Sequence, residues 1–124
     1  KKVMHFRPFE NFEEISDEYS QADIVFLTPD QLKKLPDKSS DLFLAIDCLH
    51  EMKPDIISYY FKEADRLSSY MYFKCWQTTV VPYDNIHYSS ESYPVPSTWT
   101  QLFKQPCVVP SDFFHAFYEI PKNP

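Results

Sequence analysis

Residues 41–76 decide the fold and read DLFLAIDCLHEMKPDIISYYFKEADRLSSYMYFKCW. Residues 42–46 are all apolar, a pattern that is typical of a strand covered on both faces and that favours a parallel sheet. Lys53-Pro54-Asp55 marks a helix start, with proline in the first turn and an acid near the positive end of the helix dipole. Apolar side chains then recur at helical spacing, at Ile56, Ile57, Tyr60, Phe61, Ala64 and Leu67. Residues 70–76 read as a second strand, so the stretch predicts a right-handed βαβ unit.

The residues before this unit predict a strand, a helix, a second strand and a short helical turn. Residues 2–6 are a short strand candidate. The acidic stretch that follows carries apolar side chains at roughly helical spacing, namely Phe9, Phe12, Ile15 and Tyr19. Residues 24–27 form an apolar run that stops at Thr28-Pro29, which is a strand signal, and residues 30–35 are expected to form one helical turn.

The residues after the unit predict a long loop, a short helix and a hairpin. Residues 78–96 are polar, irregular and rich in Tyr and Pro, and residues 99–104 suit a short helix. Two β-rich runs, residues 107–109 and 113–120, are joined by Pro110-Ser111-Asp112 and predict an antiparallel hairpin. We therefore expect residues 1–124 to form a single α/β domain, with part of a doubly wound, mostly parallel sheet that ends in an antiparallel hairpin.

The composition narrows the class of function. The formal net charge of -6 argues against a nucleic-acid groove, which needs clustered Lys and Arg. No stretch approaches the roughly 20 apolar residues of a membrane span. The three widely spaced cysteines, Cys48, Cys75 and Cys107, indicate free thiols in a reducing compartment, so we expect a cytoplasmic protein.

The chain contains no Gly, the residue that lets a backbone pass close to a phosphate or a cofactor. It therefore has no P-loop and no G-x-G-x-x-G turn, which are the usual means of binding a nucleotide-like cofactor. This absence favours one hypothesis for the function: a non-catalytic binding or interaction module that retains half of a Rossmann-like sheet.

Four short motifs favour a different hypothesis, because their order resembles a known family. They are His50-Glu51-Met52 after a strand, Tyr59-Tyr60-Phe61 in a helix, Lys74-Cys75-Trp76 at a strand end and YPVPSTW at residues 93–99. From about Ala22 onward the chain resembles the C-terminal half of class I S-adenosylmethionine-dependent methyltransferases, nearest to the putative sugar O-methyltransferases. The sequence FFHAFYEI, residues 113–120, is similar to the last strand of that family.

The resemblance implies that residues 1–124 are the distal, Rossmann-like portion of a methyltransferase domain, without its Gly-rich cofactor loop. It implies S-adenosylmethionine as cofactor, with an incomplete binding site in this chain, and a hydroxyl of a sugar or glycan as methyl acceptor. Asp30 and Gln31 match positions that meet the adenine ring in the family, and Asp47 could reach the cofactor. Without the resemblance, Asp30 would belong to an ordinary helix N-terminus and Asp47 could be a buried, hydrogen-bonded residue.

The cluster that follows residues 42–46 holds the candidate catalytic residues. In open α/β sheets, ligands bind outside the carboxyl ends of the strands, which is where this cluster is expected. We expect His50 to be the general base, because an imidazole accepts a proton near neutral pH. Glu51 could orient His50, act as the base itself or cap the following helix.

The remaining polar and aromatic residues lead to three further expectations. Cys48, His50 and Cys75 could come together on neighbouring strand ends, but structural zinc sites normally have four ligands, so we expect no metal site. Aromatic side chains of the long loop could line a sugar pocket or simply cover the sheet edge, namely Tyr83, His87, Tyr88, Tyr93 and Trp99. An exposed sheet edge where the first strands of the family should lie would predict a homodimer.

Overall fold

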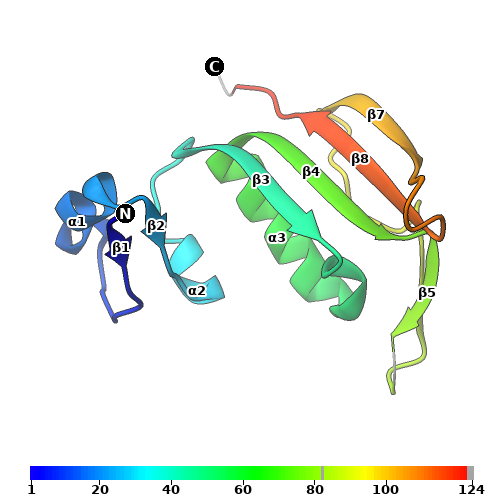
Figure 1. Ribbon diagram of the computed structural model, residues 1–124, viewed down its shortest axis with the longest axis horizontal. Helices are drawn as coiled ribbons and strands as arrows, with labels where there is room; N and C mark the ends of the chain where they lie inside the picture. Colours follow the sequence, from blue (N-terminus) through cyan, green and yellow to red (C-terminus); the bar gives the residue numbers. More distant parts are fainter. Residues whose placement is uncertain (82, 123–124) are drawn as a thin grey trace.

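The computed structural model describes residues 1–81 and 83–122, which form a mixed α/β fold (Figure 1). Its strands are β1 (Val3–Met4), β2 (Ile24–Val25), β3 (Ser40–Ile46), β4 (Ser68–Trp76), β5 (Thr78–Val81), β6 (Ile86–Ser89), β7 (Thr100–Pro106) and β8 (Phe113–Glu119). Its helices are the 3-10 helices η1 (Phe12–Glu14) and η2 (Leu49–Glu51) and the α-helices α1 (Ser16–Gln21), α2 (Pro29–Leu32) and α3 (Pro54–Leu67). No helix in the described part of the chain is long and apolar enough to cross a membrane.

The main sheet has four strands in the order β3-β4-β8-β7 (Figure 1). β3 and β4 are parallel, in register from Ser40 opposite Ser68 to Ile46 opposite Lys74, and α3 connects them. This confirms the predicted strand–helix–strand unit. β8 runs antiparallel to both β4 and β7, so an antiparallel hairpin ends the sheet as predicted. Its first strand, however, is β7 at residues 100–106, and the predicted strand at residues 107–109 belongs to the connection between β7 and β8. The sheet is therefore mixed rather than mostly parallel.

α3 covers one face of this sheet with its apolar stripe. Ile57, Phe61, Ala64 and Leu67 are all buried, and Phe61 meets Phe73 of β4 with ring centroids 5.5 Å apart. Burial of each large apolar side chain contributes about 1.5–3 kcal/mol. The helix therefore owes its stability mainly to this packing, in addition to its N-terminal proline and acid.

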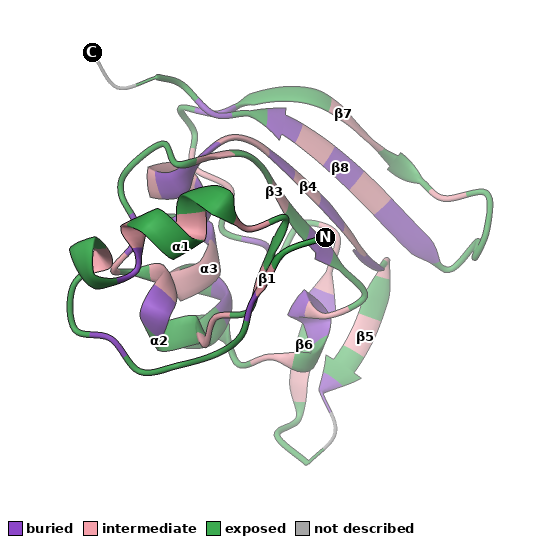
Figure 2. Cartoon of the chain, turned by 60° about the vertical axis from the view of Figure 1, so that its left-hand side comes forward, coloured by how far each residue is buried: buried purple, intermediate pink, exposed green. Residues whose placement is uncertain are grey.

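The segment between β6 and β7 continues the cover on the same face. The ring of Tyr93 lies 5.4 Å from that of Phe73 and 5.8 Å from that of Phe114. The indole of Trp99 stacks on Phe61 at 5.8 Å. Figure 2 shows the result along β8, where buried residues largely alternate with partly exposed ones. One face of the sheet thus carries the core.

Two predictions for residues 78–104 are wrong. Residues 78–96 contain the antiparallel pair β5 and β6 instead of an irregular loop, and residues 99–104 are largely strand β7 instead of a helix. β5 and β6 pair with each other in a local hairpin, whereas β7 is held as a strand by its ladder with β8, with Phe103 opposite Phe117. Local helical spacing in a six-residue window could not compete with that ladder.

Within the described part of the chain, β3 is covered on one face only, which corrects the prediction of cover on both. Phe43 and Ala45 point toward α3, and Ala45 is buried. Leu42, Leu44 and Ile46 point to the opposite face and are 42%, 57% and 54% exposed. The physical reason is that α3 and the segment before β7 both pack on the other side of the sheet.

The N-terminal residues form a small unit beside β3. β1 and β2 pair in parallel, and η1 and α1 connect them, so the predicted strands and helix are confirmed with shorter bounds. Met4, Phe9 and Ile15 form a separate core for this unit. Figure 1 places the pair beyond β3, on the side away from β4, and the pair is not bonded to the main sheet.

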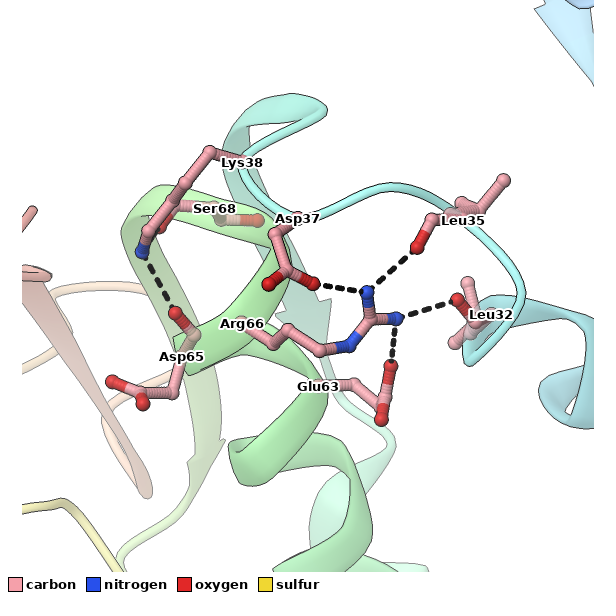
Figure 3. A network of polar contacts seen from close by, with 8 residues as sticks. All are labelled: Leu32, Leu35, Asp37, Lys38, Glu63, Asp65, Arg66 and Ser68. Carbon is pink, nitrogen blue, oxygen red and sulfur yellow. Dashed lines mark hydrogen bonds and ion pairs between the residues drawn. The ribbon is translucent and has the colours of Figure 1, made fainter. Parts of the chain in front are cut away.

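Arg66 ties the connection between α2 and β3 to the C-terminal turn of α3 (Figure 3). Its guanidinium donates to the carbonyl oxygens of Leu32 and Leu35 at 2.9 and 2.6 Å. It also pairs with the carboxylates of Asp37 and Glu63 at 2.8 and 2.7 Å. Burial alone would lower the pKa of Arg66, but the two carboxylates raise it. The connection into β3 is thereby held in place.

Candidate functional site

The candidate site lies where β3 ends. The amide of Asp47 donates to the carbonyl oxygen of Lys74 at 2.8 Å, which is the last bond to β4 before the chain turns away. Asp47 takes up the left-handed region with a φ of 54°, a conformation that Asp tolerates better than most residues. The turn leads directly into η2, which carries His50 and Glu51. The three side chains therefore stand at the carboxyl ends of the two parallel strands.

His50 joins two carboxylates at this position. Its Nε2 lies 3.4 Å from Oδ1 of Asp47 and 3.3 Å from Oε1 of Glu51. Only 1% of the His50 side chain is exposed, whereas the side chains of Asp47 and Glu51 are 59% and 61% exposed. The Nδ1 atom of His50 is buried and has no hydrogen-bond partner among residues 1–81 and 83–122. The buried imidazole thus lies beneath two carboxylates that face solvent.

Two aromatic rings hold His50 from the side of the sheet. Trp76 and Phe113 both meet it edge-on, with centroids 6.4 and 6.2 Å away, and lie 4.9 Å from each other. They come from the end of β4 and the start of β8, which meet because these strands are antiparallel. Neither Trp76 nor Phe113 was among the site residues expected from the sequence. The position of Trp76 at the end of the second parallel strand is the signal that could have identified it.

The two thiols near the cluster, those of Cys48 and Cys75, are in their protonated, less reactive form. Burial raises the pKa of Cys75 to about 11 and also raises the pKa of Cys48, so both thiols stay protonated near neutral pH. Within residues 1–81 and 83–122, no group of three or more His, Cys, Asp or Glu side chains could hold a metal ion. The chemistry of the site is therefore that of its two carboxylates and imidazole.

The residues predicted to meet the adenine ring lie on α2. The side chain of Gln31 is committed to the main chain, because its Oε1 accepts from the amide of Thr28 at 3.0 Å and its Nε2 donates to the carbonyl oxygen of Arg7 at 2.8 Å. Asp30 is 91% exposed and lies 3.5 Å from Lys33. α2 is fixed against α3 by the hydroxyl of Tyr59, which donates to the carbonyl oxygen of Pro29.

The predicted acceptor residues do not form one pocket. Tyr93 and Trp99 are buried, and the indole of Trp99 donates to Oδ1 of Asp65 at 2.7 Å. Tyr83 and His87 are exposed on the β5–β6 hairpin. Two of these four predicted acceptor residues therefore lie in the core and two lie on the surface.

The β5–β6 hairpin borders the cluster. The hydroxyl of Tyr88 donates to the carbonyl oxygen of Met52, the residue that follows η2, at 2.6 Å. An open hollow of about 480 Å³ lies over the hairpin, with Thr79, His87 and Ser92 among its lining residues. Of the predicted acceptor residues, His87 and Tyr88 line this hollow.

The fold of this chain is similar to that of a protein of known structure. The crystal structure of the PH0226 protein from Pyrococcus horikoshii OT3 is similar to this chain, with a TM-score of 0.57 and 14% sequence identity. The match covers 88% of this chain and 64% of that chain, so residues 1–124 span less than two thirds of the neighbour's length. No family model and no curated protein matches the sequence. The likeness supports the mixed α/β fold alone.

Proposed function

We propose that residues 1–124 are the acceptor-side portion of an S-adenosylmethionine-dependent O-methyltransferase, acting on a hydroxyl of a sugar or glycan in the cytoplasm. The observation that carries the proposal is the Asp47–His50–Glu51 cluster at the carboxyl ends of two parallel strands. Ligands of open α/β sheets bind at such an edge. The order of the motifs in the sequence and the antiparallel hairpin beside the parallel pair give further support.

Methyl transfer to a neutral hydroxyl needs a group that removes the hydroxyl proton and holds the oxygen in position. Glu51 suits the first task better than His50, because its carboxylate faces solvent while the imidazole is buried. His50 then acts as a positioning residue, with Nε2 between the carboxylates of Glu51 and Asp47. In this refinement the hydroxyl proton moves to Glu51, and the carboxylate of Asp47, 3.4 Å from Nε2, helps to orient the imidazole.

The acceptor would lie between the cluster and the β5–β6 hairpin. His87 and Tyr83 are the exposed candidates on the hairpin for hydrogen bonds to sugar hydroxyls. Tyr93 would support this surface from beneath, since its ring stacks on that of Tyr88 in the core, whereas Trp99 packs on Phe61 and Tyr118 nearer the other end of the sheet. The bond from Tyr88 to Met52 keeps the hairpin at the required position.

The residues present do not fit S-adenosylmethionine by themselves. Both ends of the Gln31 amide are bonded to the main chain, and the Asp30 carboxylate stands in solvent. The chain also contains no Gly for a close turn at the cofactor. The proposal therefore assigns the main cofactor contacts to residues outside 1–124 and keeps Asp30, Gln31 and Asp47 as candidates for the remaining contacts at the rim of a Rossmann-like sheet.

Calorimetry with S-adenosylhomocysteine tests this proposal. The complete product of the gene should bind the ligand, and a polypeptide limited to residues 1–124 should bind it at least tenfold more weakly. A complete protein that shows no heat of binding, with either the cofactor product or the cofactor itself, would contradict the methyltransferase proposal. Sugar binding without cofactor binding would instead support the non-catalytic module, which the absence of Gly favours.

A further inference from the structure

We infer that the methyl acceptor is a neutral glycan chain of two or more sugar units, and that it lies in a groove running from the Asp47–His50–Glu51 cluster along β5. We call this depression the acceptor groove and define it by Trp76, Thr78, Val80, His87 and Asp112. Trp76 is the residue on which the sugar unit next to the methylated one stacks. The inference rests on the proposed function for the role of the cluster, but glycan binding can be measured without the cofactor.

Two neighbouring hollows form the acceptor groove. Thr78 lines both the hollow of about 480 Å³ over the β5–β6 hairpin and a second hollow of about 350 Å³ at the start of β5. Val80 and His87 also line the first hollow, and Trp76 and Asp112 line the second. Each hollow falls within the range of small-ligand pockets, which is about 300–1,000 Å³. The two hollows meet at Thr78 and therefore make one elongated depression.

The strand geometry gives the acceptor groove its length. β5 begins two residues after the end of β4, and Figure 1 shows it leading away from the main sheet at that point. Side chains two positions apart in a strand point to the same face, so Thr78 and Val80 lie on one face of β5, with His87 of β6 opposite Val80. Positions 76 to 80 span about 13 Å at the rise of an extended chain. That span exceeds one sugar ring, so a free sugar beside Glu51 would leave most of the groove empty.

Trp76 connects the acceptor groove with the cluster. The centre of its ring lies 6.4 Å from that of the His50 imidazole, and Nε2 of His50 lies 3.3 Å from Oε1 of Glu51. Phe113 also contacts the Trp76 ring, at 4.9 Å, yet Trp76 is 37% exposed. An aromatic ring held in this way offers a rigid apolar surface to the C–H face of a sugar. A sugar unit on Trp76 is thus a neighbour of the unit whose hydroxyl reaches Glu51.

The polarity of the lining matches the hydroxyls of a neutral glycan. Among the described residues that line the hollow over the hairpin, there is no Lys, Arg, Asp or Glu. The hydroxyls of Thr78 and Ser92 and the imidazole of His87 can donate hydrogen bonds to sugar hydroxyls and accept them. In the second hollow, the carboxylate of Asp112 can accept from a sugar hydroxyl. A phosphorylated or sulfated ligand would need cationic partners, so the lining favours an uncharged chain.

Gln77 fixes the junction between the main sheet and the hairpin, where the two hollows meet. Its main-chain amide donates to the carbonyl oxygen of Asp112 at 2.8 Å, and its carbonyl oxygen accepts from the amide of Ser90 at 3.0 Å. Its side-chain amide donates to the carbonyl oxygen of Ser111 at 2.9 Å. These bonds hold the two hollows in line before a ligand arrives. A preformed groove of this kind lowers the ordering cost of binding a chain.

Binding of the complete gene product to an array of neutral oligosaccharides, printed as length series that start from the monosaccharide, tests the inference. We expect at least one series in which chains of two or more units bind at least about tenfold more tightly than the monosaccharide. Trp76→Ala should remove this preference, whereas Trp76→Phe, which keeps an aromatic ring, should retain most of it. Equal binding of all lengths, or no binding to any series, would overturn the inference.

A second pair of substitutions tests the groove without touching the cluster. Thr78→Arg places a long side chain where the two hollows meet and should weaken binding of the preferred chain at least about tenfold. Thr100→Arg on β7, where the native threonine is also exposed, is the matched control and should leave the affinity within about twofold. Equal affinities of the two variants would overturn the inference.

Calorimetry with S-adenosylhomocysteine separates this inference from the proposed function. A complete protein that binds the cofactor product but no glycan would refute the acceptor groove and leave the methyltransferase proposal in place. A protein that binds glycan chains but not the cofactor product would refute the proposed methyl transfer and leave the groove as a glycan site.

Discussion

The buried imidazole of His50 lies 3.3 Å from the solvent-facing carboxylate of Glu51. The two residues are adjacent in the sequence, and the turn at Asp47 together with η2 directs one side chain inward and the other outward. In such a pair the exposed residue, Glu51, can contact a substrate, and the buried residue, His50, can hold the carboxylate of Glu51 in a fixed orientation.

Substitutions at the two positions should therefore have different effects. Glu51→Gln should reduce methyl transfer by the complete protein about 10²–10⁴-fold and change the unfolding free energy by less than about 0.5 kcal/mol, because the side chain is exposed. His50→Ala should cost about 2–3 kcal/mol, because it leaves a cavity between Trp76 and Phe113. Turnover and urea unfolding of both variants measure this division of roles.

The control for the first substitution is Glu91→Gln, since Glu91 is also exposed and its side chain pairs with Lys104 instead of His50. It should leave turnover within a few-fold of the unsubstituted protein. If Glu51→Gln behaves like this control while His50→Ala abolishes turnover in a protein that is still folded, His50 itself is the base, as the sequence alone suggested.

The Cys75 thiol makes the protein sensitive to alkaline pH. Burial raises its pKa from 9.0 to about 11, and the negative field of Cys48 adds to the rise. The folded state therefore favours the protonated thiol. The resulting stability is complete below about pH 9 and is lost as the pH rises through 11; the whole shift corresponds to about 3 kcal/mol, of which about 2 kcal/mol is lost by pH 11.

Cys75→Ala should remove this part of the alkaline destabilisation. The unfolding free energy of the variant, measured in urea between pH 8.5 and pH 11, should fall by about 2 kcal/mol less than that of the unsubstituted protein. Buried tyrosines such as Tyr93, whose pKa is also raised by burial, lower the stability of both proteins over the same range. Identical pH slopes in the two proteins would show that the thiol is not buried as described, and Cys107→Ala serves as the control.

Arg66→Met should lower the free energy of unfolding strongly, although the side chain of Arg66 is partly exposed. The carboxylate of Glu63 is only 6% exposed and loses its partner at 2.7 Å, and two carbonyl oxygens lose a donor. Removal of one partner from a buried ion pair typically costs about 3–5 kcal/mol. Lys104→Met is the matched control, because its partner Glu91 is 81% exposed, and it should cost less than about 1 kcal/mol.

Urea unfolding of the two methionine variants measures the difference, and the double variant Arg66→Met with Glu63→Gln should recover part of the loss. Recovery is expected because the unpaired buried charge, not the missing side chain, carries most of the cost. Equal stabilities of the two methionine variants would mean that the Arg66 network contributes no more than an exposed ion pair.

The central βαβ unit could be predicted from the sequence because its signals are local. Ile57, Phe61 and Ala64 recur at helical spacing, Pro54 marks the start of the helix, and both flanking strands are apolar runs. β7 could not be predicted, because its conformation depends on a ladder with β8 that lies about a dozen residues further on. The exposure of Leu44 could not be predicted either, because an apolar run shows that a strand face is suited to burial but does not show what covers that face.

The position of the candidate site was predictable, and the state of its side chains was not. A polar cluster after a buried strand indicates the carboxyl edge of a sheet, and the structure places His50 and Glu51 there. The sequence could not show that the side-chain amide of Gln31 is hydrogen-bonded to the main chain of Thr28 and of Arg7. The bond to Arg7 joins residues 24 positions apart. It also could not show that Trp99 is a core residue, which depends on Asp65 and Phe61 of α3.

The two tryptophans offer a direct test of that last assignment. Trp99 stacks on Phe61 and donates to Asp65, whereas Trp76 is 37% exposed and contacts the rings of His50 and Phe113. Trp99→Phe should cost about 2–3 kcal/mol, since it removes a hydrogen bond to a carboxylate as well as packing volume. Trp76→Phe should cost less than about 1 kcal/mol. Acrylamide should quench the fluorescence of Trp99 in the second variant less than that of Trp76 in the first. The reverse order would mean that Trp99 stands in an open pocket and is free to stack on a sugar, as the motif at residues 93–99 originally suggested.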